Sequence, residues 1–360
     1  MKIVNIIKKV FLLIKAAVIG ATGYAGQELM RLLIQHPQVE VSVITSRSNK
    51  DQRYDSMYGN YTNVSELTFS ENNILEVSEQ VDVIFLALPH GIASNLVTKE
   101  VLSNAKVIDL GADYRISDVH VYEDWYNTKH GSQKLLEEES IYGLCELNRN
   151  EISKYSLIAN PGCYTTCSIL SLAPIIDKHF IDKKSIIIDA KSGVTGAGRS
   201  LDISTHFTEC NESIKAYKIA SHRHTPEIEE QLSKVAGDDI QLIFAPHLVP
   251  MNRGILATCY VKLTEEIHID YIYQMYLEFY KDDHFVRLLN KGLNPETKWV
   301  KGSNYCDIGI NVDTRTNTLI VVGAIDNLIK GAAGQAVQNM NILFGFKETT
   351  GLEQIPMFPA

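Results

Sequence analysis

The feature that most constrains the fold is a glycine-rich turn between an apolar segment and an amphipathic segment near the start of the chain. Residues 16–19 are apolar, residues 27–34 carry apolar side chains at helical spacing, and glycine occupies every third position of the turn between them. A strand, a glycine turn and a helix in this order let backbone N–H groups approach a pyrophosphate. The turn therefore predicts a dinucleotide site, with an ordinary turn as the alternative. The expected cofactor contacts are Gly20, Thr22, Gly23, Tyr24, Ala25 and Gly26.

The rest of the first half alternates apolar runs with helical patterns. The apolar runs are residues 39–44, 81–88, 106–110, 141–144 and 157–159, and residues 92–102 carry a helical pattern. Strands that alternate with helices form a doubly wound parallel sheet, so we expect an N-terminal Rossmann-type α/β domain. Residues 117–139 have no clean period and are expected to form an excursion near the ligand cleft.

The end of the second expected strand indicates which nicotinamide cofactor binds. A site for NAD usually places a carboxylate there for the ribose hydroxyls, but this chain has Ser46, Arg47 and Ser48. Hydroxyl groups and a guanidinium suit a 2′-phosphate. We therefore expect NADP(H), with a solvated polar loop as the alternative.

The pattern changes to long strands in the second half. Residues 184–194, 241–250 and 254–263 read as strands, and residues 307–325 read as a hairpin. Consecutive strands with few helices predict a largely antiparallel sheet and an α+β domain, and a homodimer or homotetramer is one way to cover its free face. The expected division is an NADP-binding domain at 1–162, a catalytic and oligomerisation domain at 163–326, and a C-terminal helix at 327–360 that packs back on the first domain.

Cys163 is the strongest candidate for a catalytic side chain. Asn160, Pro161 and Gly162 form a turn signal before it, and a helical pattern follows. A sulfur at the start of a helix is favoured as a thiolate by free N–H groups and the helix dipole, and the same N–H groups can hold an oxyanion. The alternative is a buried structural cysteine. Cys167, one turn later, is expected to face the core.

Two histidines precede another helix. His222 and His224 come just before Pro226, and Glu227 lies in the first helical turn. This arrangement predicts an acid/base unit in which Glu227 orients His222, with His224 as the less favoured acid/base and a substrate contact. Hydrogen-bonded loop histidines are one alternative. A metal site is disfavoured, because no further His or Cys cluster has ligand spacing.

Four other polar residues are candidate ligand contacts. Arg115 follows a strand and could hold a substrate anion or pair with Asp109 or Asp113. Arg199 ends a glycine-rich loop that either closes over a substrate anion or is a hairpin tip. Asn160 is a predicted substrate contact, and Asn327, at the start of the last helix, is a predicted cofactor contact.

Composition excludes several classes of protein. The chain has 360 residues, a net charge of −9 and six scattered cysteines without a CxxC pair. The acidic balance argues against nucleic acid or an anionic membrane as a partner, and the cysteine usage indicates a reducing cytoplasm. Residues 1–15 are broken by lysines and too short to span a bilayer, so we expect a short extension that leads into the first strand.

Several of these segments together resemble a known family. They are 20–26, 160–164, 221–228, 246–254 and 330–336, and they occur in the order found in the N-acetyl-γ-glutamyl-phosphate reductases, over nearly everything after Lys15. The departures are Thr165, where many members have proline, and the extra N-terminal stretch. The resemblance implies that NADPH reduces N-acetylglutamyl 5-phosphate to the 5-semialdehyde with release of phosphate, in arginine biosynthesis.

The residues fit that chemistry, because a thiolate is a strong nucleophile toward an acyl phosphate and the resulting thioester can accept a hydride. The nearest alternatives are reductases of aspartyl or N-acetyl-aminoadipyl phosphate and a phosphorylating glyceraldehyde-phosphate-type dehydrogenase. A non-catalytic NADP sensor would not need Cys163 and His222, and a cysteine hydrolase would not need the glycine turn.

Overall fold

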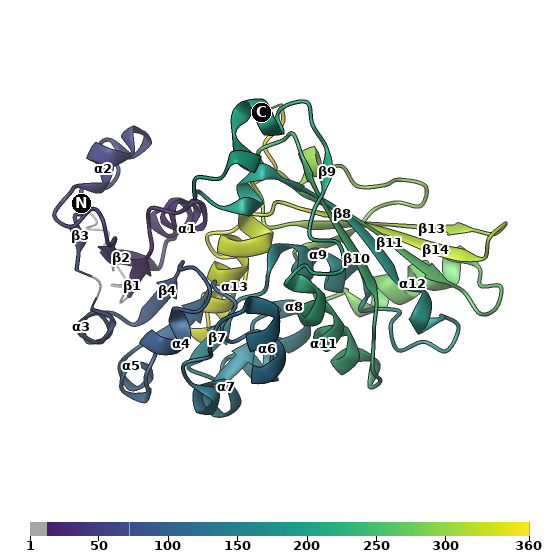
Figure 1. The fold of residues 1–360 in the computed structure, drawn as a ribbon, viewed down its shortest axis with the longest axis horizontal. Helices are drawn as coiled ribbons and strands as arrows, with labels where there is room; N and C mark the ends of the chain where they lie inside the picture. The colour runs from purple at the N-terminus through teal and green to yellow at the C-terminus, as the bar shows by residue number, and fades with distance from the viewer. Residues whose placement is uncertain (1–12, 72, 360) are drawn as a thin grey trace, which may run out of the picture.

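In the part of the chain that the structure describes, the fold is built around two sheets of seven strands each. The computed structural model describes residues 13–71 and 73–359. Most of the predicted N-terminal extension, residues 1–12, lies outside the described residues. Figure 1 shows the first sheet and its helices on one side, the second sheet on the other, and the C-terminal helix in yellow between them.

The first sheet is wholly parallel and has the order β3-β2-β1-β4-β5-β7-β6. The predicted doubly wound sheet is confirmed. Residues 16–19 of its central strands and residues 83–86 beside them are apolar and fully buried, because both faces of the sheet are covered. The strands are β1 (Ile14–Ile19), β2 (Val39–Thr45), β3 (Phe69–Ser70), β4 (Val83–Leu86), β5 (Lys106–Asp109), β6 (Ser140–Tyr142) and β7 (Leu157–Ala159).

The helices of the first half differ from expectation at two places. The pattern at 92–102 forms two short helices, because Val97 is extended and the Thr98 side chain caps the second. The expected excursion at 117–139 contains two helices, capped by Asp118 and Ser132. The first buries Tyr122 and Tyr126, whose amphipathic side chains make the apolar pattern of the helix hard to recognise in the sequence. The helices are α1 (Tyr24–Ile34), α2 (Tyr54–Met57), η1 (Gly59–Tyr61), α3 (Ile74–Ser78), α4 (Ala93–Leu96), α5 (Lys99–Asn104), α6 (Val119–Tyr126), α7 (Gln133–Glu139) and α8 (Cys145–Ile152).

The second sheet is mixed but largely antiparallel, as predicted. Its order is β12-β13-β14-β11-β8-β10-β9, and only the pairs β8–β10 and β12–β13 are parallel. The strand expected from residue 184 begins at Ile187, because the Asp182 side chain caps a short helical turn at 183–185. The strands are β8 (Ile187–Gly193), β9 (Lys215–Ala216), β10 (Ile243–Val249), β11 (Ile255–Lys262), β12 (Val286–Leu288), β13 (Cys306–Asp313) and β14 (Thr318–Ile325).

Helices cover one face of the second sheet. Strands β10 and β11 alternate buried with more exposed residues, which is the pattern of a sheet packed on one side. Cys167 is fully buried in this core, as expected for a core-facing residue of α9. The helices and helical turns are α9 (Cys163–Leu172), η2 (Lys183–Ser185), η3 (Val194–Ala197), η4 (Ile203–Thr205), α10 (Phe207–Cys210), α11 (His224–Ala236), α12 (Ile269–Phe279) and η5 (Thr297–Trp299).

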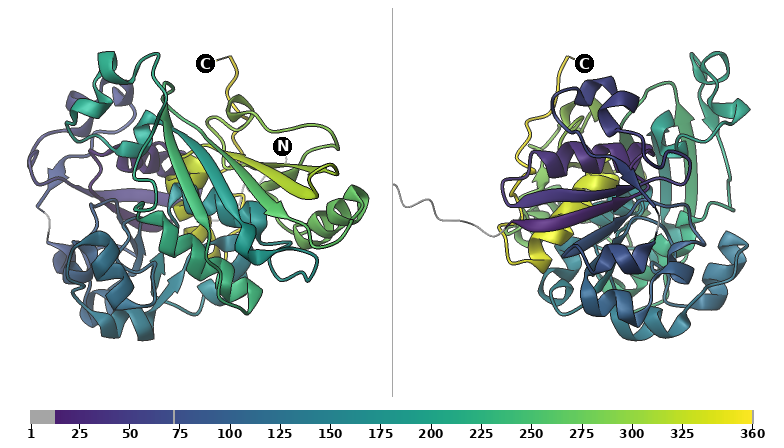
Figure 2. Two further views of the ribbon diagram at one scale, coloured as in Figure 1. Left: turned by 45° about the vertical axis from the view of Figure 1, so that its right-hand side comes forward. Right: turned by 90° about the vertical axis from the view of Figure 1, so that its left-hand side faces the viewer.

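The end of the chain returns to the junction between the two sheets. It forms a π-helical segment, η6 (Ile329–Ala333), followed by α13 (Gly334–Leu343). Helix α13 contacts α1 and α8, and η6 contacts α1, α9 and β14. Both views of Figure 2 place this yellow segment beside the first sheet. No helix among the described residues is long and apolar enough to cross a membrane.

Candidate active site

A cleft of about 910 Å³ opens between the first sheet and the second half of the chain. The residues at its wall follow β1, β2, β4 and β5, as expected for ligand binding at the carboxyl ends of parallel strands. None of the described residues in this wall is an aspartate or glutamate, although four are arginines. In a chain with a net charge of −9, this concentration of positive charge favours anionic ligands in the cleft.

The glycine turn closes tightly against its neighbours. Gly20 has a φ of +89°, and a Cβ atom there would lie 2.4 Å from the carbonyl oxygen of Ala87. A Cβ atom at Gly26 would lie 2.3 Å from the carbonyl oxygen of Gly20. Helix α1 begins at Tyr24, within this glycine segment, so the free N–H groups of its first turn belong to the cleft wall, and the segment fits the pyrophosphate of a dinucleotide. All six predicted contacts in the turn belong to the cleft wall.

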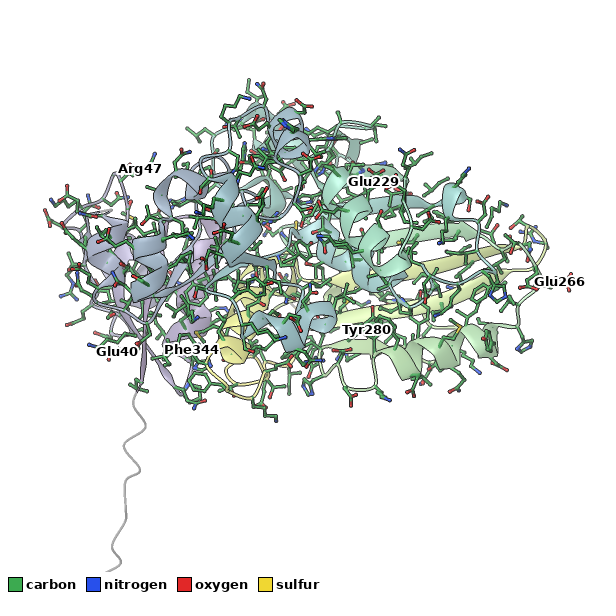
Figure 3. All side chains as sticks on the ribbon, turned by 90° about the horizontal axis from the view of Figure 1, so that it is seen from below. Glu40, Arg47, Glu229, Glu266, Tyr280 and Phe344 are labelled. Atoms are coloured by element: carbon green, nitrogen blue, oxygen red, sulfur yellow. The ribbon has the colours of Figure 1, made fainter. Side chains whose placement is uncertain are left out.

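The residues predicted to bind a 2′-phosphate lie on the same wall. Ser46, Arg47 and Ser48 line the cleft beyond the end of β2. The side chain of Asn49 donates a hydrogen bond to Ser46 Oγ at 2.9 Å. Arg47 is exposed and projects from the surface (Figure 3), where a bound phosphate could reach it.

Cys163 is the first residue of α9 and lies half-buried at the cleft. Burial raises the pKa of its thiol to about 11, although the N–H of Tyr164 and the guanidinium of Arg115 act in the opposite direction. The predicted position is therefore found, but the prediction of a resting thiolate is corrected. Desolvation of the sulfur outweighs the helix start, so the thiol needs a base.

Glu227 holds the turn that carries Cys163. Its fully buried carboxylate accepts hydrogen bonds from the N–H of Gly162 at 2.9 Å, Thr165 Oγ1 at 2.9 Å and the hydroxyl of Tyr142 at 2.8 Å. All three donors bind Oε1, and Oε2 faces Arg115 at 3.5 Å. Orientation of His222 by Glu227 stays a prediction, since the described residues give no hydrogen bond between the two. The Thr165 hydroxyl also lies 2.5 Å from a second acceptor, the carbonyl oxygen of Gly162.

The two histidines have different surroundings. His222 Nδ1 accepts the backbone N–H of His224 at 3.1 Å, and the His222 ring packs against Tyr164, Tyr217 and Phe244. His224 lines the cleft and lies beside the turn that carries Cys163. Its Nε2 is so close to Gly162 that a Cβ atom built there would lie 2.6 Å from it. Its buried Nδ1 has no hydrogen-bond partner among the described residues.

Both imidazoles are neutral near neutral pH. Burial, aided by His224 and nearby cations, lowers the pKa of His222 to about 2. Burial and Arg115 lower the pKa of His224 well below its ordinary value. A neutral imidazole has a free lone pair for a proton, but a lowered pKa also makes it a weak base. Of the two rings, that of His224 lies against Gly162, the residue before Cys163.

Arg115 is buried where the two halves of the cleft meet. Its Nε donates to the carbonyl oxygen of Asn160 at 2.7 Å, and its Nη2 donates to that of Leu110 at 2.7 Å. Its carboxylate partner is Glu227 at 3.5 Å, not Asp109 or Asp113 as the alternative reading expected. The Asn160 side chain donates to the carbonyl oxygen of Ala332 at 3.1 Å, so it ties the turn to η6 as well as lining the cleft.

Arg199 and Asn327 hold segments together in this structure. Arg199 Nη1 donates to the carbonyl oxygen of Thr22 at 2.9 Å and to the hydroxyl of Tyr58 at 2.6 Å. Asn327 accepts the N–H of Gly254 at 2.8 Å and donates to Thr195 Oγ1 at 2.9 Å. Both line the cleft, and Arg199 lies on the cofactor side rather than beside Cys163.

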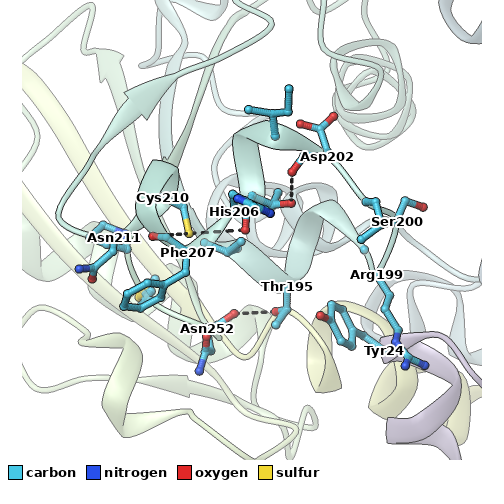
Figure 4. Close-up of a pocket in the computed structure, with 17 residues that line it drawn as sticks. Tyr24, Thr195, Arg199, Ser200, Asp202, His206, Phe207, Cys210, Asn211 and Asn252 are labelled. Atoms are coloured by element: carbon cyan, nitrogen blue, oxygen red, sulfur yellow. Dashed lines mark hydrogen bonds between the residues drawn. The ribbon is translucent and has the colours of Figure 1, made fainter.

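A second hollow of about 700 Å³ adjoins the cleft beyond Arg199. Figure 4 shows Arg199 next to Tyr24 at one side of it, with Phe207 and Asn211 at the other. Among the described residues, no group of three or more His, Cys, Asp or Glu side chains is arranged to hold a metal ion.

Sequence reasoning missed several residues of the site. Arg223 lines the cleft, and Tyr142 and Thr165 bind Glu227. His90, which the sequence offered as a residue of the cofactor cleft or a plain loop histidine, does line the cleft. Gly331 packs on the nucleophile, since a Cβ atom there would lie 2.7 Å from Cys163 Cβ. Arg223 lies inside the His-Arg-His motif, so its position between two candidate histidines was the available signal.

Comparison with known proteins agrees with this architecture. The profile of the semialdehyde dehydrogenase NAD binding domain matches residues 15–155, and that of the semialdehyde dehydrogenase dimerisation domain matches residues 163–327. Aspartate semialdehyde dehydrogenase II from Vibrio cholerae, complexed with ASA, has a TM-score of 0.67 at 17% identity over 92% of this chain and 98% of its own. The Candida albicans enzyme with NADP has a TM-score of 0.66 at 17% identity, with the same coverage. Fold and cleft define a protein of the semialdehyde dehydrogenase class.

Similarity over nearly the full length narrows this class. N-acetyl-gamma-glutamyl-phosphate reductase from Lachnoclostridium phytofermentans is 51% identical over 96% of this chain and 100% of its own length. The protein of that name from Campylobacter jejuni is 52% identical over 94% of this chain and 98% of its own. The chain belongs to the N-acetyl-gamma-glutamyl-phosphate reductase family.

Proposed function

We propose that the chain reduces N-acetyl-L-glutamyl 5-phosphate to N-acetyl-L-glutamate 5-semialdehyde with NADPH, through a cysteine thioester, as a step of arginine biosynthesis. The observation that carries the proposal is family membership at about half identity, joined to a cysteine at a helix start in a cleft whose described wall has four arginines and no carboxylate. The aspartate semialdehyde dehydrogenases share the fold at 17% identity, so they do not decide the substrate.

Cofactor binding is assigned to the glycine turn, to Ser46, Arg47 and Ser48, and to Asn327. The turn would place its N–H groups on the pyrophosphate, and Arg47 would meet the 2′-phosphate. When bound, NADPH supplies the hydride that reduces the thioester. A related enzyme of the same fold was solved with NADP, which supports the choice of cofactor.

We assign the first chemical step to Cys163 and His224. The anionic substrate would raise the pKa of His224, which then accepts the thiol proton. The sulfur attacks the acyl carbon and a C–S bond forms, while the bond to phosphate breaks and the departing phosphate takes up a proton from solvent. In this proposal the N–H groups at the start of α9 stabilise the oxyanion, and Arg115, whose Nη1 lies next to Gly162, binds the leaving phosphate.

Release of the product reverses the proton transfer. After reduction, the hemithioacetal collapses to the aldehyde and the sulfur leaves as a thiolate. His224 then returns the proton to Cys163, which restores the starting state. We assign Glu227 a positioning role, because its carboxylate binds both the Gly162 N–H and the guanidinium of Arg115.

We also infer that the chain works as a homodimer or homotetramer in the cytoplasm. The dimerisation-domain profile supports self-association. Apolar side chains exposed on the second half offer surface for a second copy, and they are Leu201, Ile203, Phe207, Ile214, Ile219 and Ile243. Burial of such side chains between copies would stabilise the assembly.

A substrate panel run with both nicotinamides tests the proposed function. Oxidation of N-acetylglutamate 5-semialdehyde should require phosphate and should be faster with NADP than with NAD. Aspartate semialdehyde and N-acetyl-aminoadipate semialdehyde are the comparison substrates. Robust activity on one of these alone, or turnover without phosphate, would reject the assignment.

The same assay tests the nucleophile. Cys163→Ser should bind NADP but lose nearly all turnover, because a hydroxyl is a much weaker nucleophile than a sulfur near neutral pH. Cys210→Ser is the matched control, since Cys210 lines the second hollow and not the cleft. Equal activity of both variants and the unaltered enzyme would remove the thioester mechanism.

A further inference from the structure

Arg223 is a cleft arginine with no carboxylate partner among the described residues. Its Nη1 lies 2.9 Å from His90 Nδ1 and 2.8 Å from His90 Nε2, and its guanidinium stacks 5.2 Å from the ring centre of Tyr126. Arg115, in contrast, has Glu227 as an ion-pair partner. The half-buried Arg223 is therefore held in place by neutral groups that leave its charge available.

The surroundings of Arg223 keep its partner uncharged. Burial and the guanidinium itself lower the pKa of His90, so this imidazole is neutral near pH 7 and can accept one N–H. A carboxylate in place of His90 would neutralise the arginine. An imidazole and a tyrosine ring fix the direction of the guanidinium without consuming its charge.

Arg115 and Arg223 occupy different places relative to the nucleophile. Arg115 Nη1 would lie 2.9 Å from a Cβ atom at Gly162, directly before Cys163. Arg223 precedes His224, and its guanidinium reaches away toward His90 and Tyr126 of the first half. The cleft thus has one cation beside the reacting sulfur and a second at a distance from it.

The proposed substrate also has two anionic groups. Its acyl phosphate must meet Cys163, and its α-carboxylate lies at the other end of a short carbon chain. We propose that Arg223, oriented by His90 and Tyr126, binds the α-carboxylate, while the phosphate lies beside Arg115. This assignment rests on the proposed function and adds the residue that recognises the end of the substrate remote from the chemistry.

The reverse reaction tests the assignment, because phosphate and the carboxylate-bearing semialdehyde are then separate substrates. Arg223→Gln should raise KM for N-acetylglutamate 5-semialdehyde by roughly 30- to 100-fold, as expected for the loss of a charge-assisted hydrogen bond. KM for phosphate and the affinity for NADP should stay unchanged. Arg223→Lys should recover only part of the loss, because an ammonium cannot make the bidentate contact.

A substrate without the charge provides the second measurement. With the carboxamide analogue of the semialdehyde, the unaltered enzyme and Arg223→Gln should have the same KM. Arg315→Gln, at an exposed arginine in the β13–β14 turn, is the matched control and should leave all constants unchanged.

The outcomes separate this inference from the proposed function. If Arg223→Gln raises KM for phosphate, changes neither KM, or still impairs use of the carboxamide, Arg223 does not bind the carboxylate. If the unaltered enzyme fails to oxidise N-acetylglutamate 5-semialdehyde, the proposed function fails first and the assignment of Arg223 falls with it.

Discussion

At the scale of the residue, the chemistry of Cys163 depends on two opposing effects. The helix start and Arg115 favour the thiolate, while burial favours the thiol and prevails, with a pKa of about 11. A thiol with a raised pKa carries less thiolate at neutral pH than an ordinary cysteine. The ligand-free enzyme should therefore protect its nucleophile from oxidation and alkylation until a substrate and a base are in place.

The rate of alkylation of Cys163 should rise with pH. Between about pH 7 and pH 9 we expect the rate with iodoacetamide to increase about 100-fold without a plateau, because the thiolate fraction grows tenfold per pH unit below the pKa. Mass spectrometry of the Cys163 peptide measures the rate in the ligand-free enzyme. The half-buried Cys210 provides an internal comparison. A plateau below about pH 8 would show that the thiolate already exists at rest.

Residue types were predictable from the sequence, but their partners were not. The turn before Cys163 and the paired histidines are local patterns, and both lie at the cleft or directly behind it. The partner of Arg115 is 112 positions away, so no local spacing could reveal Glu227. The same holds for His90 and Arg223, which are 133 positions apart. The pKa of Cys163 also depends on burial by distant segments.

At the scale of the element, the π-helical segment η6 supports the nucleophile from behind. It packs on α9, and Gly331 lies against Cys163 so closely that no side chain fits between them. The helical spacing of apolar residues predicted a terminal helix here. That the helix begins with a π-helical turn could not be predicted from residue types. π-helical turns are rare in proteins, and those that occur often lie at functional sites.

Gly331→Ala should move the nucleophile. Its Cβ would lie 2.7 Å from Cys163 Cβ and 3.1 Å from Cys163 Cα, so the backbone of one segment must shift. We expect kcat to fall about 10- to 100-fold, because small displacements of reacting atoms are costly. Steady-state kinetics measure this. Gly59→Ala is the control, since nothing lies within 4 Å of its Cβ position, and an unchanged kcat for Gly331→Ala would contradict the packing argument.

The long elements were predictable because their apolar patterns are strong. Strands β1, β4 and β5 are apolar runs buried on both faces, and β13 and β14 flank a polar turn. The helices between residues 93 and 139 have at most eight residues each, and capping side chains such as Thr98 decide where they start. Such boundaries depend on single hydrogen bonds rather than on a repeating pattern.

At the scale of the whole molecule, a buried ion pair joins the end of the chain to the first half. Lys330 Nζ lies 2.6 Å from Glu146 Oε1, and both side chains are essentially inaccessible to solvent. Burial opposes ionisation of Glu146, but Lys330 holds its pKa below the ordinary value. Gln338 also binds Lys330, so η6, α13 and α8 share one network.

Lys330→Met should destabilise the whole fold. It leaves the Glu146 carboxylate buried without a counter-charge, which costs about 3–5 kcal/mol of the free energy of unfolding. Urea unfolding followed by circular dichroism measures the change. The double variant with Glu146→Gln should recover part of it, because the lone charge is gone.

An exposed ion pair provides the control. Lys154 and Glu151 are 2.7 Å apart, with side chains 61% and 52% exposed. Lys154→Met should cost less than about 1 kcal/mol, because water screens such pairs. If the free energy of unfolding falls by the same amount in the Lys330 and Lys154 variants, the buried ion pair does not stabilise the contact between the end of the chain and its first half.

The return of the chain to the junction has a consequence for biosynthesis on the ribosome. Asn327, Gly331 and Ala332 border the cleft, and Asn339 donates a hydrogen bond to Asn160 in the cysteine turn. Translation delivers these residues after every other part of the cleft, while earlier segments can already begin to fold. A nascent chain that already contains the glycine turn and Cys163 should therefore still be inactive, because the last segment of the cleft is missing. Activity should switch on abruptly when the last segment emerges and docks, rather than grow with the length synthesised.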